Sequence, residues 1–390
     1  MNRITIPLEG RIDSGNAAQV EETLRAQLSG KTVDAVLIDA AKLEYISSAG
    51  LRVILRLKKT LNDLTVENVS PEVYEIFEMT GFTELMTVKK AYRVVSVRGC
   101  EVVGEGQNGT IYRVDRDTVV KAYKNADALA EIQHEREVAR LALILGVPTA
   151  ISYDVVRVGD SYGSVFELLD CRSFAKILAD EPERLDWCVG EFAGLLKKLH
   201  GIVVPAGKLP SMKASLQKRA ARVRPLLPAA YGEKLARMID EVPERDTMIH
   251  GDYHTKNIVL AGDEVLLIDM DTLSVGHPLF ELAQMFCCFV GFGEYDSTVT
   301  SDFQGYSTAL AREFWRRTLR AYLGTGDEEA VTAIENKLRC VAYARLIDWN
   351  TRHKDPGDKT GMAERELWTR ELLELLDKVE SLDFSVSPNT

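Results

Sequence analysis

The sequence predicts a mixed α/β protein in two parts: a small sheet covered by helices, and a larger part that starts with strands and continues mainly as helices. In residues 3–90, runs of branched apolar residues alternate with segments whose apolar residues recur at helical spacing. From residue 92, strand-type runs surround a glycine-rich loop, and long helical patterns follow residue 280. A chain of 390 residues is also too long for one comfortable hydrophobic core. We therefore expect an N-terminal domain of residues 1–91 and a two-lobed domain of residues 92–390.

The composition excludes several classes of protein. Apolar residues make up 46% and charged residues 27% of the chain, as in an ordinary globular protein. The net charge of −11 argues against non-specific binding to nucleic acid, which needs a basic surface. The start of the chain has no signal-peptide core, and the most apolar segment, LAQMFCCFVGF, is too short to cross a membrane. The six cysteines form no C-x-x-C pair, which indicates reduced thiols and a cytoplasmic protein.

Strands and helices alternate along the N-terminal domain. The strand-type runs are ITIPLEGRI (4–12), VDAVLIDAA (33–41) and the shorter LTVENV (64–69). The helical segments are NAAQVEETLRAQL (16–28), AGLRVILRLKKTL (49–61) and PEVYEIFEMTGF (71–82). Ser70 and Pro71 supply a helix N-cap followed by proline at the first helical position. This alternation predicts one small sheet covered by helices.

Two serines, Ser47 and Ser48, lie between the second strand and the helix that follows it. The simpler interpretation is a helix N-cap, because a serine hydroxyl there satisfies free backbone amides. The alternative is a phosphorylation switch, because a phosphate at a helix N-terminus meets the same amides and a favourable dipole. The residues alone leave both interpretations open.

The element order β-β-α-β-α-β-α, with GRID (10–13), LIDAAKLEYISSAGL (37–51) and SPEVYEIFEMTGF (70–82), resembles a STAS domain of the anti-sigma-factor antagonist type. The resemblance covers nearly all of residues 1–91. In that family a partner kinase phosphorylates the serine just before the helix, which corresponds to Ser48. This chain departs from the best-known members because Ser47 stands where they carry aspartate. The resemblance implies a regulatory module with a serine kinase or an anti-sigma-type protein as its partner.

Gly104, Gly106 and Gly109 form a G-x-G-x-x-G loop, a pattern used by dinucleotide folds and by kinases to bring backbone amides close to phosphates. A dinucleotide fold needs a helix directly after the loop. Here the residues after the loop, TIYRV, are typical of a strand, and a D-R-D turn leads to another strand, DTVVKAYK. Strand–loop–strand with a lysine on the third strand is the arrangement of a kinase phosphate cover.

Lys121 is the lysine on that third strand. It is either a solvated lysine on an edge strand or the lysine that contacts the α- and β-phosphates of a nucleotide and is held by a glutamate of the next helix. That helix is predicted over residues 126–146. We expect Glu137 to be the partner, with Glu135 as the second choice.

Residues 250–271 contain HGDYHTKNIVL and, further on, LLIDMD, for which three interpretations compete. His250 and His254 have the i,i+4 spacing of a zinc site, but no glutamate follows the first histidine and the flanking residues predict strand–loop–strand. A turn with satisfied polar groups is the purely structural interpretation. In the third, Asp252 is the carboxylate beside an attacking hydroxyl, and Asn257 and Asp269 are oxygen ligands of Mg²⁺. The third explains most of the residues.

H-G-D-x-H-x-x-N followed by I-D-x-D resembles the aminoglycoside phosphotransferase and choline kinase group, which shares the protein-kinase-like fold. The matches cover about residues 92–285, and the resemblance divides the domain into an N-lobe (about 92–170) and a largely helical C-lobe (about 171–390). It makes Asp252 the catalytic base and makes Asn257 and Asp269 the holders of Mg²⁺. ATP is then held by Lys121, by the loop from Gly104 to Gly109, and by a hinge at Phe166, Glu167 and Leu168.

The expected function is an ATP- and Mg²⁺-dependent phosphotransferase that acts on a hydroxyl of a small molecule, with an N-terminal STAS module. No motif names the acceptor, although the acidic balance of the chain permits one that bears an amine. The alternative is a signalling switch that works by protein–protein contact under the control of Ser48 phosphorylation. Its kinase-like half would be a nucleotide sensor or a degenerate kinase.

Overall fold

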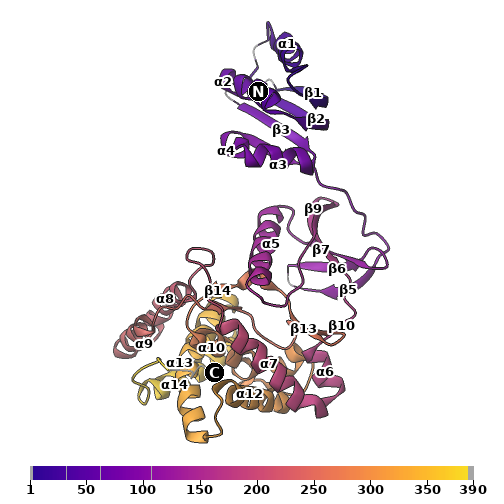
Figure 1. Cartoon of the computed structure of the whole chain (residues 1–390). Coiled ribbons are helices and arrows are strands. Elements are labelled where there is room, and N and C mark those ends of the chain that lie inside the picture. Colours follow the sequence, from indigo (N-terminus) through magenta and orange to yellow (C-terminus); the bar gives the residue numbers. More distant parts are fainter. Residues whose placement is uncertain (1–2, 32, 62, 107, 385–390) are drawn as a thin grey trace. The chain divides into compact units, whose positions relative to one another are not determined.

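The computed structural model describes residues 3–31, 33–61, 63–106 and 108–384 (Figure 1). The chain forms two compact units. The first comprises Met1–Val114, Val119–Ala128 and Tyr153–Val165, and the second comprises Asp115–Thr118, Leu129–Ser152 and Phe166–Thr390. The mixed α/β class predicted from the sequence is confirmed.

The N-terminal sheet has four parallel strands in the order β1-β2-β3-β4. They are β1 (Arg3–Ile12), β2 (Ala35–Ile46), β3 (Asp63–Val69) and β4 (Thr87–Lys90). Parallel neighbours need crossover connections, and these are provided by α1 (Ala17–Leu28), α2 (Ser48–Thr60), α3 (Pro71–Met79) and α4 (Phe82–Leu85). Alternate strand residues and the inner helix faces form one core, in which Ile38, Val66 and Phe77 are fully buried.

Two details of this sheet bear on the sequence predictions. The predicted β-β start is wrong: residues 3–12 form one strand, whose pairing with β2 shifts register between Pro7 and Glu9 and again between Gly10 and Arg11. Such bulges let one strand change direction without ending. The predicted start of α3 is confirmed, because Ser70 caps the helix by accepting a hydrogen bond from the amide of Val73.

A second sheet has five strands in the order β5-β6-β7-β9-β8. They are β5 (Glu101–Glu105), β6 (Gly109–Arg113), β7 (Thr118–Tyr123), β8 (Asp154–Val158) and β9 (Ser161–Glu167). The first three are antiparallel neighbours joined by tight connections, as the glycine loop and the D-R-D turn predict. This sheet therefore carries the glycine loop and Lys121.

The second unit is mainly helical around a large apolar core. Its helices are α5 (Leu129–Ile144), α6 (Phe174–Asp180), α7 (Leu185–His200), α8 (Met212–Val223), α9 (Ala229–Glu241), α10 (Pro278–Phe289), α11 (Ser297–Gln304), α12 (Thr308–Leu323), α13 (Glu328–His353) and α14 (Lys359–Leu376). Short strands β10 (Cys171–Ser173), β11 (Met248–Ile249), β12 (Ile258–Ala261), β13 (Glu264–Leu267) and β14 (Ser274–Val275) lie among them, with 3₁₀ turns η1 (Pro182–Arg184), η2 (Arg224–Leu226), η3 (Met270–Thr272) and η4 (Gly291–Gly293). At its centre the rings of Phe192, Tyr253 and Phe314 pack edge to face.

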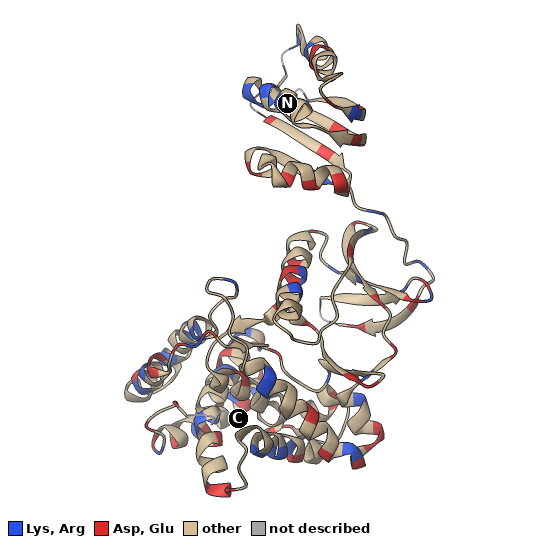
Figure 2. Cartoon of the chain, viewed as in Figure 1, with Lys and Arg blue, Asp and Glu red and all other residues tan. Residues whose placement is uncertain are grey.

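Charged residues of both signs are interspersed along the helices of the second unit, whereas in the N-terminal domain α2 is basic and α3 is acidic (Figure 2). All six cysteines are free thiols, and Cys188, Cys287 and Cys340 are buried. Over the residues that the structure describes, none of the helices combines the length and the apolar character that a membrane crossing demands.

Candidate active site

The loop after β11 begins with a tight turn at His250 and Gly251. Strands β11 and β14 pair antiparallel, so this turn lies directly against η3. Gly251 has φ of +84°, and a β-carbon there would lie 2.6 Å from the carbonyl oxygen of Thr272. A side chain would suffer both backbone strain and a steric clash. Only glycine fits between His250 and the catalytic candidate Asp252.

The buried carboxylate of Glu281 binds both backbone amides of this turn. Glu281, on α10, is 0% exposed, and its two oxygens accept hydrogen bonds from the amides of His250 (2.6 Å) and Gly251 (2.9 Å). The ring nitrogen Nε2 of His200 lies 3.7 Å from the same carboxylate, while His200 Nδ1 hydrogen-bonds the hydroxyl of Tyr322 at 2.7 Å. Glu281 was not among the residues predicted from the sequence. The signal available was one acidic residue in the apolar helix sequence PLFELAQMFCCF.

Both ring nitrogens of His250, and both of His254, contact residues of the loop or of the segment beside it. His250 Nδ1 accepts from the amide of Asp252 at 3.2 Å, so Nε2 carries the proton and donates to the carbonyl of Ile268, also at 3.2 Å. His254 Nδ1 accepts from the amide of Lys256 at 3.3 Å, which places the proton of Nε2 toward Asp252 Oδ2, 3.3 Å away. Among the described residues no cluster of three or more histidine, cysteine or acidic side chains could hold a metal ion. The arrangement is that of a rigid loop, not of a zinc site.

Asp252 itself has a side chain that is 38% exposed. Burial raises the pKa of its carboxyl group, but the hydrogen bond from His254, together with electrostatic interactions with His254, His250 and Arg345, outweighs burial and leaves the pKa below its usual value. The carboxylate is therefore held ionised and ready to accept a proton or a hydrogen bond.

Replacing His254 with phenylalanine is expected to raise the pKa of Asp252. Phenylalanine keeps the ring beside Phe303, which the histidine ring meets at 5.1 Å, but it cannot donate to the carboxylate. Burial, which raises the pKa of Asp252, is then no longer opposed by this hydrogen bond. NMR titration of the Asp252 carboxyl, assigned by comparison with Asp252→Asn, measures the shift. The exposed His353, replaced in the same way, is the control, and an unchanged pKa in His254→Phe would show that the hydrogen bond has no influence.

Asn257 closes the loop. It is 7% exposed, and its amide nitrogen donates to the carbonyl of Asp252 at 3.0 Å and approaches Asp252 Oδ2 at 3.4 Å. The amide of Ile268 donates to the carbonyl of Asn257 at 2.9 Å, so Asp269 follows directly beside Asn257. Asp269 adopts the left-handed conformation, with φ of +64°, which is uncommon outside glycine. Such strain is retained where a side chain has to be aimed in one direction.

The donor set of this loop fits a hard divalent cation. The nitrogen of the Asn257 side-chain amide is used within the loop, so the oxygen is the atom of this amide that remains to bind a cation. Asp269 adds a carboxylate to the same segment. Magnesium is commonly bound by one or two protein oxygen ligands together with phosphate oxygens and water. Asn257 and Asp269 are therefore suited to hold Mg²⁺ in the way predicted from the sequence.

The predicted phosphate loop lies in the five-stranded sheet. Gly104 is within β5, and the amide of Gly106 donates to the carbonyl of Gly109 at 2.9 Å. A β-carbon on Gly109 would lie 2.5 Å from the carbonyl oxygen of Ala122, so glycine is required where β6 and β7 approach. Lys121, on β7, lies with its ammonium group 5.1 Å from the centre of the Tyr123 ring. The loop and the lysine thus share one small sheet.

On α5 the structure separates the two candidate partners of Lys121. Glu135 is 9% exposed, whereas Glu137 lies on the exposed face of the helix. A carboxylate removed from water interacts more strongly with a cation than an exposed one. Burial therefore favours Glu135, the second choice, over Glu137, and the pairing with Lys121 stays a prediction.

The predicted hinge follows the last strand of this sheet. Phe166 and Glu167 end β9, and the amide of Leu168 donates to the carbonyl of Asp117 at 2.9 Å. Asp117 belongs to the D-R-D turn between β6 and β7. This bond anchors the segment to the neighbouring turn. The contact of these residues with adenine stays a prediction.

The two serines of the N-terminal domain have different roles. The N-cap of α2 is Ser47, whose hydroxyl accepts hydrogen bonds from the amides of Ala49 (3.2 Å) and Gly50 (3.5 Å). Ser48 is the first residue of the helix and is exposed. Gly50 packs so closely that a β-carbon would lie 2.7 Å from Ile46 and 2.8 Å from Ile12. The hydroxyl of Ser48 is thus free for modification, while that of Ser47 is used in the helix.

This division of roles is testable by stability. Replacing Ser47 with alanine should lower the free energy of unfolding of this domain by about 1 kcal/mol, the usual cost of losing an N-cap. Ser48→Ala, the matched control one residue away, should change it by less than about 0.5 kcal/mol. Urea unfolding followed by circular dichroism measures both. Equal effects would contradict the assignment of the cap to Ser47.

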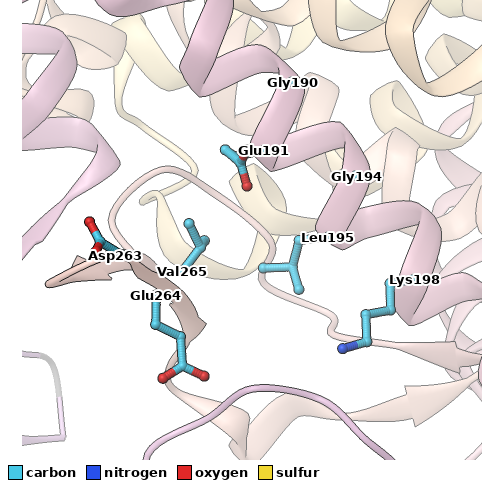
Figure 3. Close-up of a pocket in the computed structure, with 8 residues that line it drawn as sticks. All are labelled: Gly190, Glu191, Gly194, Leu195, Lys198, Asp263, Glu264 and Val265. Atoms are coloured by element: carbon cyan, nitrogen blue, oxygen red, sulfur yellow. The ribbon is translucent and has the colours of Figure 1, made fainter.

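A cavity of about 430 Å³ lies elsewhere in the second unit, between α7 and the turn that joins β12 to β13 (Figure 3). Figure 3 shows side chains of α7 facing those of the turn, and the lining residues are Gly190, Glu191, Gly194, Leu195, Lys198, Asp263, Glu264 and Val265. None of the candidate catalytic or metal-holding residues is among them. The cavity is therefore not the place where the chemistry of the loop would occur.

A small parallel sheet, a five-stranded sheet and a mainly helical part follow one another along the chain. The family model described as "Phosphotransferase enzyme family" (APH) matches residues 99–330, and the model of the STAS domain matches residues 2–95. The first match covers more than half of the chain. The protein therefore belongs to the phosphotransferase enzyme family and carries a STAS domain at its N-terminus, as both resemblances in the sequence predicted.

Individual relatives agree with this division. BtrV of Bordetella bronchiseptica (strain RB50), described as an anti-sigma factor antagonist, is 41% identical over 85 residues, which is 21% of this chain and 72% of BtrV. A choline/ethanolamine kinase family protein from Mesorhizobium loti superposes with a TM-score of 0.45 at 16% identity, over 72% of this chain and 89% of that one. Aminoglycoside phosphotransferase APH(4)-Ia gives 0.49 at 12% identity, over 71% and 93%. The assignment of both domains rests on the sequence matches.

Proposed function

We propose that this protein is an ATP- and Mg²⁺-dependent phosphotransferase that transfers the γ-phosphoryl group of ATP to a hydroxyl of a small molecule. The observation that carries the proposal is the loop of residues 250–257. Asp252 is held there as an ionised carboxylate by His254, on a turn fixed by the buried Glu281. The oxygens of Asn257 and Asp269 follow on the same segment. Membership of the phosphotransferase family supports the reaction class.

In the proposed reaction the hydroxyl of the acceptor lies against the carboxylate of Asp252. The acceptor oxygen forms a bond to the γ-phosphorus as the bond from that phosphorus to the β,γ-bridging oxygen breaks, and ADP leaves. The hydroxyl proton passes to Asp252. The rigid bracing of the loop keeps the carboxylate in one position, and positioning supplies much of the rate enhancement in such transfers.

Asn257 and Asp269 would hold Mg²⁺. The bound ion would neutralise negative charge on the phosphates. On the nucleotide side, the loop Gly104–Gly109 and Lys121 would bind the phosphates. The buried Glu135, in preference to Glu137, would hold the lysine in place. Phe166, Glu167 and Leu168 would contact adenine.

The proposed domain boundaries are 1–91 for the STAS domain and 92–390 for the phosphotransferase domain. Strand β4 ends at Lys90, and β5 begins at Glu101. These bounds are consistent with the family matches at residues 2–95 and 99–330. Separate expression of the two segments, each followed by thermal unfolding, tests whether each folds alone.

The test of the function is acceptor-dependent release of ADP by the full chain with ATP and Mg²⁺. Hydroxyl-bearing small molecules are supplied one at a time, and they include amine-bearing ones because the net charge of −11 permits a cationic acceptor. We expect at least one class of acceptor to stimulate release well above the rate with water alone. A chain that binds ATP but releases no ADP with any acceptor would be a nucleotide sensor, not a transferase.

A second function is supported by a specific observation in the STAS domain. Ser48 is exposed at the N-terminus of α2 while its neighbour Ser47 performs the capping. We propose that phosphorylation of Ser48 controls the affinity for an anti-sigma-type protein or a serine kinase, because the phosphate would change the charge at the start of the helix. The description of BtrV as an anti-sigma factor antagonist supports this kind of partner. Phosphopeptide mass spectrometry of the protein from its own host is the test, with Ser48→Ala as the control.

A further inference from the structure

Arg345, in the phosphotransferase domain, lacks a partner among the residues that the structure describes. It lies on α13 between the buried residues Ala344 and Leu346 and is itself partly buried. Among the described residues it makes neither a hydrogen bond nor an ion pair. Two other arginines of the same helix are paired: Arg339 with Glu371 at 3.0 Å, and Arg352 with Asp348 at 3.2 Å. A partly buried guanidinium without a counter-charge is costly.

A series of buried and partly buried hydrogen bonds links this part of α13 to the catalytic loop. The hydroxyl of Thr255 donates to Gln304 Oε1 at 2.7 Å, and the amide nitrogen of Gln304 donates to the carbonyl of Cys288 at 3.3 Å. The thiol of the adjacent Cys287 donates to the carbonyl of Ala342 at 3.5 Å, one helical turn before Arg345. Helices α10 and α13 pack along each other at this point (Figure 1). The position of Arg345 is thus fixed relative to the loop that carries Asp252.

Electrostatics agree with this placement. Burial raises the pKa of the Cys288 thiol, and the charges of Asp252 and Arg345 act on it with opposite signs. Cys288 therefore lies within reach of both groups. The free guanidinium and the catalytic candidate share one neighbourhood.

A second guanidinium lies at Asp348, one helical turn after Arg345 on α13. Arg219, on α8, has a side chain that is 18% exposed, and its Nε is 3.5 Å from Asp348 Oδ2. Asp348 is already bound by Arg222 at 2.6 Å and 2.9 Å and by Arg352 at 3.2 Å. Burial and the charge of Arg345 lower the pKa of Arg219 to about 10. Three arginines thus share one carboxylate and Arg345 has none, so this cluster carries excess positive charge.

We propose that the acceptor carries an oxyanion, a carboxylate or a phosphate, which binds between Arg345 and Arg219 so that the acceptor's hydroxyl faces Asp252. A guanidinium matches either oxyanion with two parallel N–H donors. The ligand would provide the counter-charge that the protein lacks at this place. The inference rests on the proposed transferase function and specifies its substrate class. It differs from the amine-bearing acceptor that the net charge permits, because the charges lining a site act on a ligand more strongly than the average of the whole chain.

The test is acceptor-dependent ADP release by the full chain with three groups of hydroxyl compounds. Glycerate and gluconate carry a carboxylate, and glycerol phosphate carries a phosphate, which separates the two sources of the oxyanion. Glycerol and glucose are neutral, and choline and kanamycin are cationic. We expect turnover of the anionic group, with kcat/KM at least tenfold above the other two groups. Preference for neutral or cationic acceptors would overturn the proposal and leave the transferase function standing, whereas release with none of them would overturn the function itself.

Variants of Arg345 then locate the site. With the best anionic acceptor, Arg345→Gln should raise the KM for that acceptor by roughly 10- to 100-fold, the effect of losing one hydrogen bond to a charged group. Arg345→Lys should recover part of it, because lysine restores the charge without the planar fork. Arg370→Gln on α14, where the side chain is 64% exposed, is the control. The KM for ATP, measured in parallel, distinguishes lost acceptor binding from general damage, and an unchanged KM for the acceptor in Arg345→Gln would refute the assignment.

Discussion

Asp252→Ala is expected to reduce acceptor-dependent ADP release by about 10²- to 10⁴-fold, the contribution usually made by a positioned general base. The carboxylate is the group of the loop held ionised toward the outside, with its pKa kept low against the effect of burial. Its loss removes both the proton acceptor and the group that orients the hydroxyl. Asp252→Asn keeps the shape and should lose nearly as much, because an amide cannot take the proton. The rate is measured with saturating ATP and the best acceptor of the panel.

The matched control for this variant is Asp263→Ala. Asp263 is an exposed aspartate in the turn between β12 and β13, eleven residues further along the chain. Its replacement should leave the rate within about twofold, in keeping with the small effects of surface changes. Thermal unfolding of both variants verifies that the fold is kept. If Asp252→Ala were as active as Asp263→Ala, the loop would not be catalytic and the proposed function would be wrong.

Glu281→Gln is expected to damage stability and rate together. The carboxylate accepts two amide hydrogen bonds, from His250 and Gly251, and both glutamate oxygens are used. In glutamine one of these oxygens becomes an NH₂ group that faces an N–H donor, so one buried amide loses its acceptor. An unsatisfied buried group of this kind costs about 1–3 kcal/mol in the free energy of unfolding. The turn before Asp252 would also lose its support, and we expect kcat to fall by about tenfold or more because a displaced catalytic group loses its alignment.

Urea unfolding and the initial rate of ADP release measure the two effects of Glu281→Gln. Glu366→Gln, an exposed glutamate on α14, is the control and should change neither. A stable variant with a full rate would show that the turn keeps its shape without the carboxylate. A loss of stability with an unchanged kcat would make Glu281 a purely structural residue.

Local patterns were sufficient to predict the segments that carry the candidate site. The strand–loop–strand around Asp252, the strands on both sides of the glycine loop and the helix over 126–146 were all expected, and they correspond to β11 and β12, β5 and β6, and α5. Periodicity and turn residues decide such elements because they depend on neighbours in the chain. The β-β start implied by the STAS resemblance was wrong, because residues 3–12 form one strand whose register shifts are absorbed in its pairing with β2.

The sequence could not reveal contacts between residues that lie far apart in the chain. Burial favours Glu135 over Glu137 only because α5 packs one face against its neighbours. In the sequence, Glu281 is only an acidic residue in an apolar helix. The fold places it against the turn at Gly251, which lies 30 residues earlier in the chain. The unpaired state of Arg345 likewise depends on which carboxylates the other arginines have already taken.

By itself, therefore, the sequence predicted the class of protein and its division into two parts, and it offered the glycine loop, Asp252, Asn257 and Asp269 as candidates for the site. These features are local in the chain, and their spacing is the one expected of residues that hold phosphates and Mg²⁺. The tertiary structure decided which serine caps α2, which ring nitrogens carry protons, what supports the turn at His250 and which charge is left without a partner. Each of these depends on desolvation and on hydrogen bonds between residues far apart in the chain, which only packing brings together.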